Sequence, residues 1–232
     1  MSTIVLVGGS FLGAWAWERV TPILIAADHD VHPLTLTGFG DRAHLGSAAT
    51  TLGTHATDIV AAIEFAGLRD VVLVAHSYGG APATVAASRI PDRVARIVYV
   101  AATIPQAGKS LFGILPPDAE EAIMQTVEDG LIPVLSDEVL DANFGRHELT
   151  PGDRAWLRAR GTGQPVNTYR DPAPADLSAV DGIPRTYVAC SGDPGDPAAP
   201  PGHELVTLDS GHWPMISRPG ELAGVLDKAA RS

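Results

Sequence analysis

A buried strand, a serine turn and a helix follow one another in the middle of this chain. The run Val71–Ala75 is continuously apolar and bounded by turn-forming residues, which predicts a strand buried on both faces. Residues 81–89 are expected to form a helix, and Ser77 lies on the turn between the two elements. A nucleophilic serine is exposed on such a turn, which is tight and strained. Small residues are needed two positions before and after the serine, and Ala75 and Gly79 fit there.

Apolar strands alternate with helices on both sides of this stretch. Five further strands are expected, at residues 3–7, 30–36, 96–102, 185–190 and 204–208. Helices are expected at residues 14–27, 54–66 and 221–230. Strands that alternate with helices favour an α/β protein with a mostly parallel sheet covered on both faces.

The alternation is interrupted between residues 104 and 181. This part is rich in proline, contains short helical patterns at 118–128 and 150–160, and has no clear buried strand. We expect a helical cap (104–181) inserted into a core formed by residues 1–103 and 182–232. Six apolar residues of this part are expected to pack on the core or to line a substrate pocket: Phe112, Leu115, Met124, Leu131, Phe144 and Trp156.

Composition narrows the class of protein. The 232 residues are 45% hydrophobic and 19% charged, which is typical of a packed globular protein. A net charge of −11 disfavours nucleic acid and anionic membranes as partners. A single cysteine, Cys190, rules out an intramolecular disulfide and a cysteine metal cluster, and we expect neither a cofactor nor a metal. Without a basic signal sequence or an apolar run of ~20 residues, a soluble cytoplasmic protein is expected.

Three candidate catalytic residues each follow a predicted strand. They are Ser77, Asp193 after the strand at 185–190, and His212 after the strand at 204–208. The carboxyl ends of parallel strands meet at one edge of a sheet, where ligands bind. Serine needs a base to become a nucleophile, and the base needs an acid that holds its tautomer. The order serine, aspartate, histidine therefore predicts a triad of nucleophile, orienting acid and base.

The acid is the least determined of the three residues. His212 is favoured among the eight histidines because it follows a late strand through a glycine. Asp193 is preferred as the acid, but Asp196 and Asp209 are alternatives in the same part of the chain. The connection from Asp193 to His212 is short and rich in proline, and proline stiffens a loop.

A glycine-rich turn follows the first strand. Residues 8–13 (GGSFLG) do not match G-x-G-x-x-G, so a dinucleotide-dependent oxidoreductase is disfavoured. The backbone N–H groups of this turn are instead suited to hold an oxyanion beside Ser77. We expect two donors, the backbone N–H of Tyr78 and that of Ser10.

Four motifs carry a resemblance to a known family: residues 5–15 (VLVGGSFLGAW), 36–45 (LTGFGDRAHL), 75–80 (AHSYGG) and 209–212 (DSGH). At these motifs the chain resembles the α/β-hydrolase superfamily. Within it, the chain is similar to the branch of plant methyl esterases and hydroxynitrile lyases with their bacterial relatives. The resemblance covers nearly the whole chain apart from the cap. It implies the α/β-hydrolase fold with an inserted helical cap and a small-molecule substrate.

The residues and the resemblance together predict a serine hydrolase. It would cleave a carboxylic ester or lactone with an apolar part through an acyl-enzyme. Hydroxynitrile lyases carry a lysine after the catalytic histidine and a hydroxyl side chain at the position of Gly9, whereas Trp213 and Gly9 stand here. The alternative is a non-hydrolytic protein of secondary metabolism, such as a lyase, a cyclase or a ligand-binding protein. The atypical Gly8 and Ala75 and the short connection after the acid motivate it.

Overall fold

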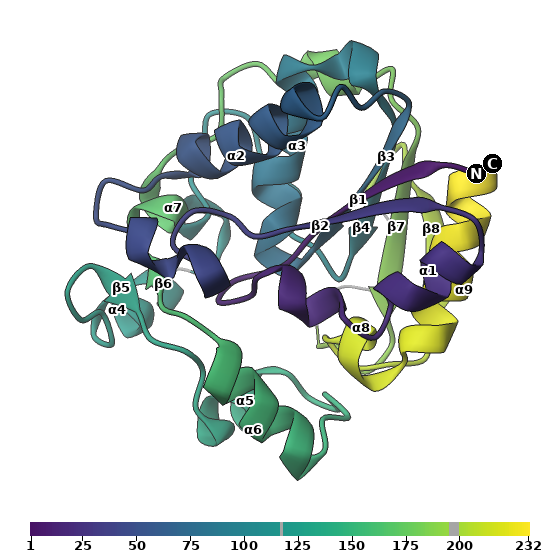
Figure 1. Cartoon of the computed structure of the whole chain (residues 1–232). Coiled ribbons are helices and arrows are strands. Elements are labelled where there is room, and N and C mark those ends of the chain that lie inside the picture. Colours follow the sequence, from purple (N-terminus) through teal and green to yellow (C-terminus); the bar gives the residue numbers. More distant parts are fainter. Residues whose placement is uncertain (117, 195–199) are drawn as a thin grey trace.

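A six-stranded sheet runs through the molecule in the order β2-β1-β3-β4-β7-β8 (Figure 1). The computed structural model describes residues 1–116, 118–194 and 200–232. Every pairing in this sheet is parallel. The strands are β1 (Thr3–Val7), β2 (Asp30–Leu34), β3 (Val71–His76), β4 (Val94–Val100), β7 (Arg185–Cys190) and β8 (Glu204–Leu208). The predicted parallel α/β sheet is therefore confirmed.

Helices cover both faces of the sheet, as expected (Figure 1). One face packs on α2 (Leu52–Phe65) and α3 (Gly80–Arg89). The other face packs on α1 (Thr21–Ala26), α8 (Pro214–Ser217) and α9 (Pro219–Arg231). Successive side chains of a strand point to opposite faces. Leu73 therefore joins the core under α2 and α3, while its neighbours Val72 and Val74 join the core under α1 and α9.

The prediction of one continuous helix over residues 14–27 is wrong. A 3-10 turn at Ala14–Trp17 and the short α1 take its place. Pro22 explains the break, because proline has no N–H for an intrahelical bond and its ring clashes with the preceding turn. Proline is tolerated in the first turn of a helix, and Pro22 lies there in α1.

Two strands have bounds that differ from the expected ones. β2 ends at Leu34 rather than at residue 36, and it contains Pro33. Proline cannot donate to a ladder, and β2 lies at the edge of the sheet, where this is tolerated. β4 begins at Val94 and stops at Val100, because Ala101 adopts a left-handed conformation with φ 43°.

Short helices and strands lie between β4 and β7, at one end of the molecule (Figure 1). This part of the chain, for which bounds of 104–181 are predicted, is here called the inserted segment. Its elements are α4 (Ala119–Met124), β5 (Leu131–Ile132), α5 (Asp137–Asn143), α6 (Pro151–Arg160), β6 (Gln164–Pro165) and α7 (Asn167–Arg170). No clear buried strand was expected here, and the structure adds a short antiparallel ladder of two residues on each side, β5 with β6. A small core holds the segment to the turn after β1, and it consists of Phe11, Phe112, Ile132 and Val166. No helix among the described residues is long and apolar enough to cross a bilayer.

Candidate active site

Ser77 occupies a strained turn at the carboxyl end of β3. It opens a 3-10 turn, Ser77–Gly79, and has φ 51°, a left-handed conformation that costs free energy in a residue with a side chain. Gly79 is required because a Cβ there would lie 2.5 Å from the carbonyl oxygen of Gly8. The turn after β1 therefore approaches the serine turn closely enough to exclude a side chain. The tight, strained turn expected around Ser77 is present.

His212 and Asp193 meet Ser77 at the same edge of the sheet. His212 follows β8, and its Nε2 accepts a hydrogen bond from Ser77 Oγ at 3.0 Å. Its Nδ1–H donates to Asp193 Oδ2 at 2.6 Å, and Asp193 lies just after β7. The Asp193 backbone N–H donates to Cys190 O, which keeps this loop close to its strand. A serine bonded to an imidazole that is itself held by a carboxylate is the arrangement that serine nucleophiles use.

The two alternative acids differ in their positions. Asp209 has other partners than His212: its carboxylate accepts hydrogen bonds from Arg146 and, at 2.9 Å, from Ser191 Oγ. Its bond to the Arg146 guanidinium lowers the pKa of Asp209. Asp196 lies outside the described residues.

The turn after β1 lies against Ser77. A Cβ on Gly9 would come within 2.7 Å of Ser77 Cβ and 2.8 Å of His76 Nδ1, so only glycine fits there. Ser10 follows it and lines the cavity above Ser77. The Ser10 hydroxyl is bonded to the Tyr169 hydroxyl at 2.6 Å, a contact that the sequence analysis missed. The backbone donors at Ser10 and Tyr78 remain predictions.

His76, the residue before Ser77, supports the backbone of His212. Its Nε2–H donates to the His212 carbonyl oxygen at 2.8 Å, and the two rings lie 4.9 Å apart. Burial, reinforced by the repulsion expected between the protonated forms of the two rings, holds the pKa of His76 well below its usual value. His76 is therefore neutral and acts as a fixed donor behind His212.

A second buried histidine fixes Tyr78. The Nε2–H of His55 donates to the Thr37 carbonyl oxygen at 2.8 Å, so its Nδ1 accepts from the Tyr78 hydroxyl at 2.9 Å. Burial lowers the pKa of His55 to about 4, against a smaller opposing effect of the bond to Thr37. Tyr169 stacks on Tyr78 with ring centroids 5.5 Å apart.

A cavity of about 790 Å³ opens above Ser77. Ser77, His212 and Asp193 line its floor, and apolar side chains of the inserted segment line its walls, among them Leu115 and Phe144. Other residues expected as candidates for the pocket pack elsewhere. Phe112 and Met124 contact the small core of the inserted segment, and Trp156 packs edge-on against Trp15 at 4.9 Å. Among the described residues, no group of three or more histidine, cysteine, aspartate or glutamate side chains is arranged to hold a metal ion.

Comparison with known proteins is consistent with this geometry. The model of the Alpha/beta hydrolase family matches residues 4–225. The chain belongs to the alpha/beta hydrolase family. Within this family it is 32% identical to a carbendazim hydrolyzing esterase of Nocardioides sp. (strain SG-4G), over 96% of this chain and 97% of the relative. It is 28% identical to Methylesterase 9 of Arabidopsis thaliana, over 99% and 98% of the two chains.

A solved structure confirms the alpha/beta hydrolase fold. An extracellular alpha/beta-hydrolase from a Paenibacillus species superposes with a TM-score of 0.84 at 21% identity, and all of both chains is covered. The expected resemblance to the branch of plant methyl esterases and their bacterial relatives is therefore confirmed.

Proposed function

We propose that this protein is a serine hydrolase that cleaves a carboxylic ester or lactone with an apolar part. The observation that carries the proposal is the hydrogen-bonded series from Ser77 through His212 to Asp193, at 3.0 Å and 2.6 Å, on the floor of a 790 Å³ cavity. Two relatives that match 96% and 99% of this chain are named as esterases, which supports the same chemistry.

In this mechanism Ser77 Oγ attacks the ester carbonyl carbon while its proton passes to His212 Nε2. Asp193 holds His212 in the tautomer whose Nε2 is free to accept that proton, and its charge stabilises the imidazolium that forms. Two backbone N–H groups, those of Ser10 and Tyr78, stabilise the oxyanion of the tetrahedral intermediate. His212 then gives the proton to the leaving alcohol, and an acyl-enzyme remains on Ser77.

Water completes the cycle. His212 takes a proton from a water molecule that attacks the acyl carbon, and then returns a proton to Ser77 Oγ as the carboxylic acid leaves. The neutral His76 holds the backbone of His212 through its 2.8 Å bond to the His212 carbonyl. This bond does not depend on the charge of the His212 ring, so the anchor persists through both half-reactions.

We assign the inserted segment, residues 104–181, as the cap that selects the substrate. It supplies the apolar wall of the cavity, from residues such as Leu115, Ile123 and Leu140. Burial of apolar surface stabilises binding by roughly 25 cal/mol per Å². A substrate with a bulky apolar acyl or alcohol group is therefore favoured over a small polar one.

The non-hydrolytic alternative is not favoured. A carbendazim hydrolyzing esterase and a pyrethroid hydrolase, which match 96% of this chain, are both named for hydrolysis. The hydroxyl that the lyases carry at the position of Gly9 does not fit here, because a Cβ at Gly9 would collide with Ser77 and His76.

A fluorophosphonate probe tests the proposal directly. The folded protein should form a covalent adduct at Ser77, and Ser77→Ala should form none. A panel of p-nitrophenyl esters, from acetate to long-chain and aromatic acids, should show turnover that rises with apolar bulk. Absence of labelling and of turnover in folded protein would overturn the proposal.

A further inference from the structure

The acid and the histidine lie on two loops joined by a short connection. β7 ends at Cys190 and β8 begins at Glu204, so residues 191–203 make the whole crossover between these parallel strands. A parallel crossover usually takes a dozen or more residues and often contains a helix. Backbone contacts of the described residues 191–193 hold part of this connection, and other parts of the chain contact it as well.

Residues 144–148 of the inserted segment, here called the strap, lie against both loops. The Arg146 backbone N–H donates to Gly192 O at 3.1 Å. The Gly192 backbone N–H in turn donates to Ser210 O at 2.8 Å. Gly192 directly precedes Asp193, and Ser210 lies two residues before His212. The strap, the acid loop and the histidine loop are thus joined in series by backbone bonds.

Two glycines allow this close approach. A Cβ on Gly192 would lie 2.7 Å from Arg146 O. A Cβ on Gly211 would lie 2.4 Å from Arg146 O and 2.4 Å from His147 Cα. Each loop therefore places a glycine against the backbone of the strap, and the strap contacts both loops directly.

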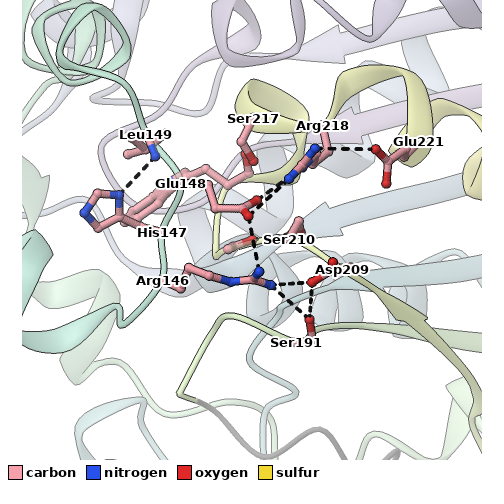
Figure 2. Close-up of polar contacts among 12 residues, drawn as sticks. Arg146, His147, Glu148, Leu149, Ser191, Asp209, Ser210, Ser217, Arg218 and Glu221 are labelled. Carbon is pink, nitrogen blue, oxygen red and sulfur yellow. Dashed lines mark hydrogen bonds and ion pairs between the residues drawn. The ribbon is translucent and has the colours of Figure 1, made fainter.

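The Arg146 side chain joins the same two loops a second time (Figure 2). Its guanidinium donates to the Asp209 carboxylate and, at 3.4 Å, to Ser191 Oγ. The Ser191 hydroxyl itself donates to Asp209 at 2.9 Å. Glu148, at the end of the strap, lies 3.6 Å from the Arg146 guanidinium and accepts two bonds of 3.2 Å from Arg218.

The start of the strap contacts the histidine ring itself. Phe144 lies with its ring centroid 4.8 Å from that of His212 and 4.8 Å from that of Trp213. It also lines the cavity. One short stretch of the inserted segment therefore touches the ring of the base and ties its loop to that of the acid.

We infer that the strap sets the distance between Asp193 and His212, and that Arg146 is a positioning residue for the proposed reaction. This inference rests on the proposed function. Arg146 lies at the surface, and an exposed ion pair contributes little to stability. The rate of catalysis is more sensitive to geometry than stability is, because a misplacement of a reacting group by about 1 Å can cost ~10²-fold in rate. Arg146 should therefore affect the rate without affecting the fold.

The test compares Arg146→Gln with the same substitution in another exposed ion pair. Arg146→Gln should lower kcat by about 10-fold and leave KM within about twofold. Arg146→Lys keeps the charge but loses the forked geometry, so its kcat should be intermediate. Arg231→Gln is the control, because Arg231 is similarly exposed and pairs with Asp227 far from the cavity. Its kcat should match wild type, and all variants should melt at similar temperatures.

A spectroscopic readout separates this inference from the proposed function. Proton NMR should show a low-field resonance for His212 Nδ1–H in its bond to Asp193, which is lost in Asp193→Ala. In Arg146→Gln the same resonance should broaden or shift, whether or not an ester substrate has been found. Arg146→Gln with the kcat and the resonance of wild type would overturn the inference while leaving Ser77 chemistry intact. A rise in KM alone would also overturn it.

Discussion

The phenolic oxygen of Tyr169 lies 2.6 Å from Ser10 Oγ, which joins α7 of the inserted segment to the turn after β1. The Tyr169 ring also stacks on Tyr78, the residue after Ser77. The two positions proposed to hold the oxyanion are therefore contacted by one partly buried tyrosine. Its position fixes the oxyanion turn through side chains, although the donors themselves belong to the backbone.

Removal of the Tyr169 hydroxyl should loosen the turn that carries Ser10. We expect Tyr169→Phe to lower kcat about fivefold, the rate equivalent of the roughly 1 kcal/mol that a hydrogen bond contributes. Ser10→Ala removes the other partner and should give a similar loss in steady-state assays. The double variant should lose no more than either single one, since both break the same bond. Additive losses would show that the two hydroxyls act independently.

Ser77→Ala should remove nearly all esterase activity without unfolding the protein. Loss of a triad nucleophile leaves about 10³–10⁴-fold catalysis over water, from the oxyanion donors and substrate binding. Single-turnover assays should detect no acyl-enzyme, and circular dichroism should match wild type. Substantial turnover by pure, folded variant would remove Ser77 from the mechanism.

Asp193→Asn tests the acid against its two alternatives. An amide at Asp193 would favour the wrong tautomer of His212, with an expected loss of up to ~10⁴ in kcat. Asp196→Asn should be near neutral. Asp209→Asn should cost far less than Asp193→Asn, because Asp209 contacts Arg146 and Ser191 rather than His212. If Asp196→Asn proves the most damaging, the role of acid passes to Asp196.

His55 should make the fold sensitive to acid. Its pKa is lowered by burial to about 4 in the folded protein, against ~6.5 in an unfolded chain. As the pH falls, His55 is protonated in the unfolded state at a higher pH than in the folded state. The free energy of unfolding therefore falls as the pH drops from about 6.5 to 4. The full loss is roughly 3 kcal/mol.

Urea unfolding at pH 7 and at pH 4.5 measures this effect. His55→Gln can keep the bonds to Thr37 and Tyr78 but does not titrate, so its stability should change less between the two pH values. A variant with the same pH dependence as wild type would assign the acid sensitivity to other groups, such as the buried His76.

Much of the fold could be predicted because its signals are local. The bounds of β1, β7 and β8 follow from short apolar runs between turn residues, and the structure has the same bounds as the prediction. Pro22 indicates a break in the helix, but the apolar pattern at residues 14–27 carried more weight in the prediction. The position of Ser77 followed from its strand and helix, which are neighbours in the chain.

The supporting contacts could not be predicted because they join distant parts of the chain. Tyr169 reaches Ser10 across 159 positions, and Arg146 reaches Asp209 across 63. The inserted segment has short helices and few periodic residues, so nothing in its sequence indicates which side chains contact the core. Such contacts depend on how the segment is oriented, which no local propensity determines.

The inserted segment contacts the surroundings of Ser77 at two places, through Tyr169 and through Arg146. This matters for attempts to change selectivity by exchanging the segment. A chimaera that received this segment from another family member would also replace Tyr169 and Arg146, and with them the contacts to Ser10 and to the loops after β7 and β8. Libraries restricted to the cavity faces of α4 and α5, at positions such as Ala122 and Val139, avoid that loss. They would change which molecule fits while leaving the geometry around Ser77 in place.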